Sequence, residues 1–281
     1  MVRHLRRAVI GTRLCVVYYS IKDGTGGRLG HSRKSYTNSC MHHEPWLTAL
    51  FNDNLAGIGN AINGLVGRAH QERPWETYIV MELLVAAFIV VLFAILRPRL
   101  SMDKPGKLQH LFEEMYNFLH QEAHDNIGHH SAQYVPLLGA IFVFILFSNL
   151  IGVIPAFESP TMFPAVPLGI ALISFLFYNV MGVKEQGGKY FAHFLGPIPA
   201  LAPLMIPIEI VSHLARPMSL TIRLYANMYA GEQVTMVFLG MTYLVMPAVF
   251  MGLHVFVSFL QAYVFTLMTM IYLGSAVSHD H

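Results

Sequence analysis

Long apolar stretches, each followed by a short charged segment, dominate this chain after its first 76 residues. The stretches at 77–96 and 134–154 hold 20 and 21 residues, with Glu82 as their only charged side chain. A third stretch follows the loop at 156–163 and runs to about Val183. About 20 apolar residues in a helix cross a hydrocarbon core of about 30 Å. The pattern therefore predicts an all-α integral membrane protein.

Two further segments depart from this simple pattern. Residues 108–130 place apolar side chains at helical spacing among acidic residues and histidines, which predicts an amphipathic helix on a membrane surface. Residues 234–278 are 45 residues without Asp, Glu, Lys or Arg, and one helix of that length would extend about 68 Å. This run forms either two spans that turn near Pro247–Gly252 or one strongly tilted helix, and periodicity does not choose between them.

The composition agrees with a membrane location. Of the 281 residues, 54% are hydrophobic and only 12% are charged, whereas soluble domains carry about 25% charged residues. The net charge of +2 is unevenly spread, because residues 1–40 hold eight Lys and Arg against Asp23 alone. The two cysteines, Cys15 and Cys40, imply no disulfide framework.

The basic leader at 1–40 is unlike everything after it. Arg13 interrupts its apolar patch, so the leader makes a poor signal peptide. We expect either that Met41 is the true start or that the leader is a disordered basic tail. Residues 41–76 then form an extracytoplasmic N-terminal segment, and residues 77–281 form the membrane domain.

Basic residues orient the membrane domain. Six Lys and Arg lie at 97–107 and 184–189, after the first and third stretches, and none lies at 156–163 or 232–237. Because Lys and Arg favour the cytoplasmic side, we expect the first group in the cytoplasm and the N-terminus outside.

The side chain that is hardest to place in this apolar setting is Arg223. Arginine stays protonated because its pKa exceeds about 12, and holding it at membrane depth costs between about 3 and 17 kcal/mol. At 100° per residue, a polar stripe within about 40° of Arg223 includes Glu209, Ser212, Arg216 and Asn227. Arg216 is also suited to snorkelling toward the interface. Snorkelling from Arg223 is difficult, which favours a functional role for it.

A second polar stripe lies on the last long segment. His254, Ser258 and Gln261 are spaced by four and three residues, while Glu232 falls opposite Arg223 on a straight helix. Facing polar stripes can enclose a water-filled path, along which Glu and His exchange protons and Asn, Ser and Gln relay hydrogen bonds. The plainer interpretation is that such side chains only fasten helices together.

No catalytic or cofactor motif accompanies these stripes. The sequence has no HExxH, P-loop or nucleophile elbow, and its paired and terminal histidines lack the spacing of a tetrahedral metal site. We therefore expect no enzyme activity in the isolated chain, and no metal, cofactor or nucleic-acid partner. An ion-conducting subunit, a stand-alone proton-coupled transporter and a structural membrane protein remain as hypotheses.

The motifs resemble those of one family. The run Ser219-Leu220-x-x-Arg223-Leu224-x-x-Asn227-Met228-x-Ala230-Gly231-Glu232 is similar to the signature of subunit a of the rotary ATP synthase membrane sector. The run at 149–155, the approach Glu209…Ser212, and His254 followed by 260–265 agree in order and spacing. The resemblance covers roughly Trp75 to Ser278, and the pairing of Glu232 with His254 is typical of bacterial members.

This resemblance implies a stator subunit in the bacterial cytoplasmic (inner) membrane, with the c-subunit ring, the b subunits of the peripheral stalk and the catalytic head as partners. Arg223 would face the ring and favour the ionised form of its carboxylates. It would also separate two offset half-channels, so that protons cross only by turning the ring. The outer half-channel and the surroundings of Arg223 would include Asn227, Glu232, His254, Ser258 and Gln261, and the cytoplasmic one would include Glu209 and Ser212.

The resemblance also implies a topology. The last two helices of the family form a long tilted hairpin, which favours one helix for 234–278, five membrane segments and a cytoplasmic C-terminus. Some relatives carry an acidic residue in the motif near Asn149, a region that Gly152 occupies in this chain, so any relay role there falls to other groups.

Overall fold

The computed structural model describes residues 46–65, 74–100, 106–128, 131–154, 157–187, 202–241 and 245–277. These residues form helices and short connections, and no strand occurs among them, so the predicted all-α class is confirmed. The chain divides into two compact units, Met1–Trp75 and Glu76–His281. The basic leader and the expected start at Met41 lie outside the described residues.

The described part of the first unit is helix α2 (Trp46–Leu65) together with Pro74 and Trp75, which pack against it. The Asn52 amide pairs with the Trp75 backbone, donating to its carbonyl oxygen at 3.2 Å and accepting from its N–H at 3.0 Å. The Trp75 indole donates to the Leu55 carbonyl at 2.8 Å. Gly59 permits this close approach, because a Cβ there would lie 2.7 Å from Pro74.

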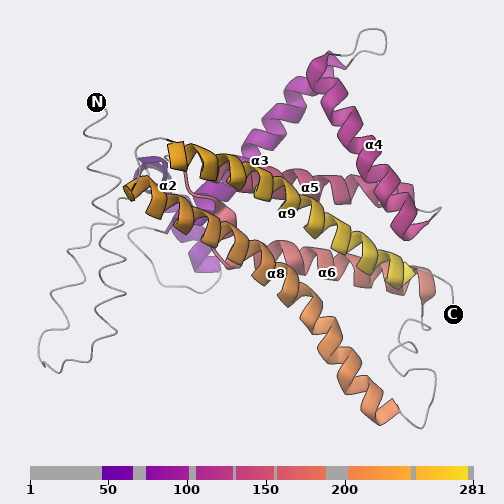
Figure 1. Ribbon diagram of the computed structural model, residues 1–281. Helices are drawn as coiled ribbons and strands as arrows, with labels where there is room; N and C mark the ends of the chain where they lie inside the picture. Colours follow the sequence, from indigo (N-terminus) through magenta and orange to yellow (C-terminus); the bar gives the residue numbers. More distant parts are fainter. Residues whose placement is uncertain are drawn as a thin grey trace, which may run out of the picture. The chain divides into compact units, whose positions relative to one another are not determined.

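The second unit is a helical bundle, with short 3-10 turns between its longer helices (Figure 1). In chain order its elements are α3 (Thr77–Leu96), η1 (Arg97–Arg99), α4 (Lys107–Ile127), η2 (Ser131–Gln133), α5 (Val135–Leu150), η3 (Ile151–Val153), η4 (Pro160–Met162), α6 (Ala165–Gln186), α8 (Ala202–Met241) and α9 (Val245–Val277).

Among the described residues, four helical segments are long and apolar enough to cross a membrane. They are Thr77–Leu96, Val135–Val153, Ala165–Gln186 and Ala248–Val277, in agreement with the predicted stretches. The predicted fifth segment, α8, falls short on hydropathy because Glu209, Arg216, Arg223 and Glu232 interrupt it. It nevertheless packs along α6 and α9, as Figure 1 shows.

The expectation of one helix for residues 234–278 is wrong at its start. Helix α8 continues to Met241 and α9 begins at Val245, so the first eight residues of the run belong to the preceding helix. The alternative turn at Pro247–Gly252 is also wrong, because α9 runs through it. Pro247 is the third residue of α9, where a backbone N–H would have no partner within the helix. The last span is a single helix of 33 residues, about 50 Å long.

The core lies where α4, α5, α6, α8 and α9 meet. Large side chains that are fully buried there include Phe142, Leu224, Phe265 and Leu273. Between membrane helices, close van der Waals packing replaces the exclusion of water as the stabilising effect. Gly274 illustrates this packing, because a Cβ at that position would collide with the carbonyl oxygen of Asn126 on α4.

The predicted amphipathic segment is helix α4. Leu119 and Ala123 are buried on its inner side against α5 and α9, while Leu111 and Phe118 remain exposed. Figure 1 shows α4 diverging from α3 at an open angle. The apolar exposed side suits contact with lipid, but the position of α4 at the membrane surface stays a prediction.

Candidate functional site

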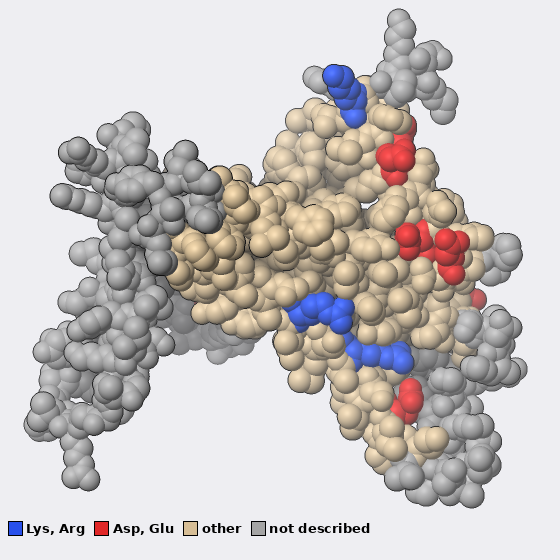
Figure 2. All heavy atoms as spheres, in the orientation of Figure 1, with Lys and Arg blue, Asp and Glu red and all other residues tan. Residues whose placement is uncertain are grey.

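Helix α8 has one packed and one open face, and Arg223 lies on the border between them. Leu224 is fully buried, whereas Ile222 is 58% exposed, and Arg223 between them is half-buried. Arg216 is half-buried as well, and Asn227 is exposed. Figure 2 shows basic side chains gathered over the middle of α8. The predicted stripe therefore follows the edge of the open face, where its polar groups reach beyond the bundle.

The two predicted stripes meet at Asn227 and Gln261. The Asn227 Nδ2 donates to the Gln261 Oε1 at 2.7 Å and so joins α8 to α9. Gln261 is only 4% exposed. Asn227 lies one helical turn after Arg223 on the same face of α8. The bond therefore holds α9 beside the α8 face that carries Arg223.

Glu232 and His254 form a second polar centre further along the same pair of helices. They are 7% and 8% exposed. A Cβ on Gly231 would lie 3.0 Å from the His254 Nδ1, so the imidazole rests on the α8 backbone directly beside Glu232. The sequence placed Glu232 opposite Arg223 on α8, and the structure buries its side chain there.

Ser258 has a more local role than predicted. Its hydroxyl is fully buried and donates to the His254 carbonyl at 2.7 Å, within its own helix. This bond holds no second helix, so the described contacts of Ser258 support the shape of α9 rather than a link between the stripes.

Glu209 and Ser212 lie toward the other end of α8. Glu209 is half-buried and Ser212 is exposed. Fourteen residues separate Glu209 from Arg223, about 21 Å along the helix axis, and nine separate Arg223 from Glu232, about 14 Å. The structure therefore spreads the predicted residues into two groups with Arg223 between them, and it does not bring Glu209 or Ser212 close to the Glu232 centre.

A buried polar cluster near the end of α5 was only partly visible in the sequence. The Ser159 Oγ donates to the Ser148 carbonyl at 2.8 Å. It also lies 2.7 Å from the Thr161 Oγ1, which donates to the Asn149 Oδ1 at 2.6 Å. Gly152 is part of this arrangement, because a Cβ there would lie 2.8 Å from the Ser159 Cβ. Position 152 thus has no room for the acidic side chain that the resemblance to the family led us to consider in this region.

His213 and Asn179 are functional candidates that the sequence analysis missed. The His213 Nε2 lies 3.1 Å from the Asn179 Oδ1, which links α8 to α6. The available signal was the position of His213 on α8, one turn after Glu209 and one turn before Pro217. Its partner on α6 was not predictable, because that pairing depends on how the two helices pack.

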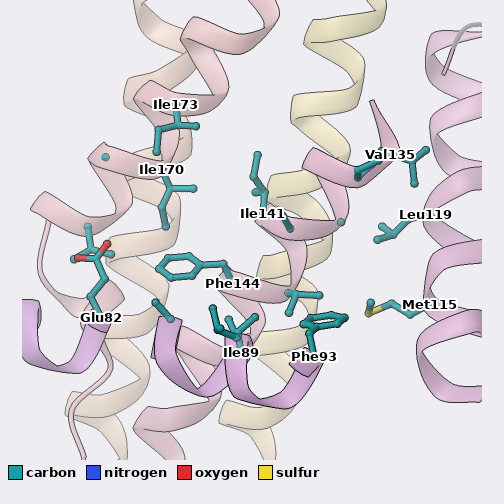
Figure 3. Close-up of a pocket in the computed structure, with 18 of the residues that line it drawn as sticks. Glu82, Ile89, Phe93, Met115, Leu119, Val135, Ile141, Phe144, Ile170 and Ile173 are labelled. Atoms are coloured by element: carbon teal, nitrogen blue, oxygen red, sulfur yellow. The ribbon is translucent and has the colours of Figure 1, made fainter. Parts of the chain in front are cut away.

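A large apolar cavity lies apart from these polar groups. It measures about 790 Å³ and opens between α3, α4, α5 and α6. Glu82 is the only charged side chain among the described residues that line it. Figure 3 shows Phe93 and Met115 bordering the cavity, with Glu82 on the side of Ile170. Since its described lining includes no residue of α8 or α9, the cavity is separate from the polar site. Within the part of the chain that the structure describes, no cluster of His, Cys, Asp or Glu could hold a metal ion.

Comparison with known proteins identifies the family. The family model described as ATP synthase A chain matches residues 79–274. The chain is 65% identical over 233 residues to ATP synthase subunit a of Solibacter usitatus (strain Ellin6076), which covers 83% of this chain and 100% of that one. It is 48% identical over 244 residues to ATP synthase subunit a of Koribacter versatilis (strain Ellin345), with 86% and 100% covered. Identity to the subunit of Aquifex aeolicus (strain VF5) is 34% over 210 residues, with 72% and 97% covered.

The family model spans both polar stripes, and the matches confirm the resemblance drawn from the motifs. This chain therefore belongs to the ATP synthase A chain family, as a bacterial subunit of the membrane sector of the ATP synthase.

Proposed function

We propose that this chain conducts protons between the two sides of the membrane and the carboxylates of a rotating c-subunit ring, and so couples proton flow to ring rotation and ATP synthesis. Arg223 faces the ring from the border of the open face of α8. Its cation stabilises an ionised carboxylate, because an opposite charge within about 4–6 Å lowers a carboxyl pKa. Each proton that crosses releases about 2.3 kcal/mol per 100 mV of membrane potential.

The distribution of polar groups along α8 is the observation that supports this proposal best. Glu232 and His254 lie on one side of Arg223, and Glu209 and Ser212 lie on the other. Two polar groups separated along the membrane normal by a fixed cation fit two offset half-channels, since a proton cannot pass the arginine without transfer to the ring. We assign the Glu232 group, with Asn227, Ser258 and Gln261, to the outer half-channel. Glu209 and Ser212 belong to the cytoplasmic one.

Family membership supports a multi-subunit complex rather than a stand-alone transporter. We propose that the open face of α8 contacts the c-subunit ring, and that other apolar surfaces face lipid and the b subunits. The catalytic head interacts through the complex. The isolated chain forms and breaks no covalent bond.

The test is ATP-driven proton pumping by the whole complex in inverted vesicles. We expect Arg223→Ala to abolish pumping while the complex still assembles, because the change removes the cation from a side chain on the border of the bundle and not in its core. Arg97→Ala, at an exposed position after α3, is the matched control and should pump normally. Normal pumping by the Arg223→Ala complex would refute the proposed function.

A further inference from the structure

The first half of α8 is held to the bundle much more weakly than the second half. No residue from Met205 to Arg216 is buried, whereas buried residues recur from Pro217 onward. Figure 1 shows the N-terminal part of α8 diverging from α6 and α9. The half-buried positions of this part share one face of the helix, and they are Ile206, Glu209, His213 and Arg216. Contacts on that face therefore determine where the first half of α8 lies.

Pro217 weakens the helix at the junction of the two halves. Proline has no backbone N–H, so the carbonyl of His213, four residues earlier, lacks its usual helical hydrogen bond. The Thr221 hydroxyl donates to the Pro217 carbonyl at 2.7 Å and so does not supply the bond that the His213 carbonyl lacks. A helix that lacks one backbone hydrogen bond bends more easily at that point. A side-chain contact next to Pro217 therefore has a large influence on where the preceding segment lies.

His213 supplies such a contact through its bond to Asn179. The Asn179 Nδ2 donates to the Phe175 carbonyl at 2.7 Å, which turns the Asn179 Oδ1 toward His213. Because that oxygen can only accept, the His213 Nε2 carries a hydrogen and donates it across 3.1 Å. The His213 ring also packs edge-to-face on Phe175 and Tyr178, with centroids 5.8 Å away in each case.

Charged and titratable groups on three helices surround this bond. Glu209 lies one turn before His213 and Arg216 one turn after it on α8. On α6 the neighbouring titratable group is Tyr178, whose ring lies 6.0 Å from that of Tyr272 on α9. Arg216 lies over the same Tyr272 ring, 5.1 Å from its centroid. Since the His213 Nε2 donates in both the neutral and the protonated imidazole, the bond to Asn179 persists in either state.

We propose that His213 and Asn179 form a latch that positions the first half of α8 on α6, and thereby positions Glu209 and Ser212 for proton transfer on the cytoplasmic side. This inference rests on the proposed function. His213 acts as a positioning residue, and the proton passes through other groups. Without the latch, the segment before Pro217 swings away from α6 and the half-channel loses its alignment.

The test compares variants that keep the hydrogen bond with variants that remove it. We expect His213→Leu and Asn179→Leu each to lower passive proton flux through the membrane sector about tenfold, which corresponds to about 1.4 kcal/mol. The double variant should be no slower than either single variant, because both remove one shared interaction. His213→Gln keeps a donor for the Asn179 Oδ1 and should restore most of the flux with an unchanged pH profile. His110→Gln on α4, at an exposed position, is the matched control.

A second measurement reports the position of the segment directly. In a background without Cys15 and Cys40, a cysteine at Ser212 should change its labelling rate with a membrane-impermeant maleimide when His213→Leu is added. The labelling rate of a cysteine at Ala226, which lies after Pro217, should not change. Unaltered labelling at position 212, or an altered pH profile in His213→Gln, would overturn the latch. The Arg223→Ala result is independent, so loss of the latch alone leaves the proposed function standing.

Discussion

The polar residues of α8 and α9 divide into those bonded within their own helix and those that reach another helix. Thr221, Ser258 and Thr266 each donate to the carbonyl four residues earlier, as hydroxyl groups in membrane helices commonly do. Asn227 instead bonds across helices to Gln261. This distinction separates hydroxyl groups whose hydrogen is bonded within their own helix from side chains that link the two helices.

The bond between Asn227 and Gln261 predicts non-additive effects. We expect Asn227→Ala and Gln261→Ala each to lower the free energy of unfolding, with a coupling of about 0.6 kcal/mol, the average for side-chain hydrogen bonds between membrane helices. The double variant should then lose less free energy of unfolding than the sum of the losses in the two single variants. SDS-induced unfolding of the purified protein measures these energies, with Gln233→Ala at an exposed position of α8 as control. Strict additivity would contradict the bond.

Gly231 predicts a second residue-level effect. Replacing a helical glycine by alanine favours the helix by about 0.8–1 kcal/mol, but at Gly231 the new Cβ would lie 3.0 Å from the His254 Nδ1. We expect Gly231→Ala to displace the imidazole and slow proton pumping several-fold. Gly252→Ala on α9 is the matched control, because nothing lies within 4 Å of its Cβ position, and it should pump normally. Equal pumping by the two variants would count against a role for His254.

At the scale of helices, hydrophobicity predicted the spans but not their partners. The bounds Thr77–Leu96 followed from the apolar run alone, because charged residues flank it on both sides. The break between Met241 and Val245 was missed, since neither charge nor proline marks it, while Pro247 pointed to a turn that does not exist. The contact of His213 with Asn179 depends on the packing of α6 on α8, which one sequence does not reveal.

The crossing of α4 and α9 predicts a packing defect at one glycine. A Cβ at Gly274 would collide with the Asn126 carbonyl, and overpacking of this kind typically costs about 1–3 kcal/mol. We expect Gly274→Ala to lower the thermal stability of the purified complex. The same change at Gly169, inside α6 and with open space around it, should not. If both variants have the melting temperature of the parent complex, the close approach of α4 to α9 is wrong.

At the scale of the whole chain, much apolar surface remains outside the core. Phe88, Val90 and Ile95 on α3 and Val211 and Ile222 on α8 are each more than 40% exposed. In water such surface would cause aggregation, but a membrane and neighbouring subunits cover it. The cavity between α3 and α6 belongs to the same apolar exterior. The exposed apolar faces are therefore those expected of a membrane subunit in a complex. The sequence could not assign a partner to each face.

The orientation of the chain in the membrane is the prediction that belongs to this scale. By the positive-inside rule we expect the helix ends after α3 and α6 in the cytoplasm and the start of α6 outside. Helix α6 has exposed residues at both ends, Ala165 and Lys184, so a cysteine at either position is open to labelling. In a background without Cys15 and Cys40, a membrane-impermeant maleimide should label Ala165→Cys in spheroplasts. Lys184→Cys should react only in inverted vesicles. The reverse pattern would invert both half-channels and assign Glu209 and Ser212 to the outer side.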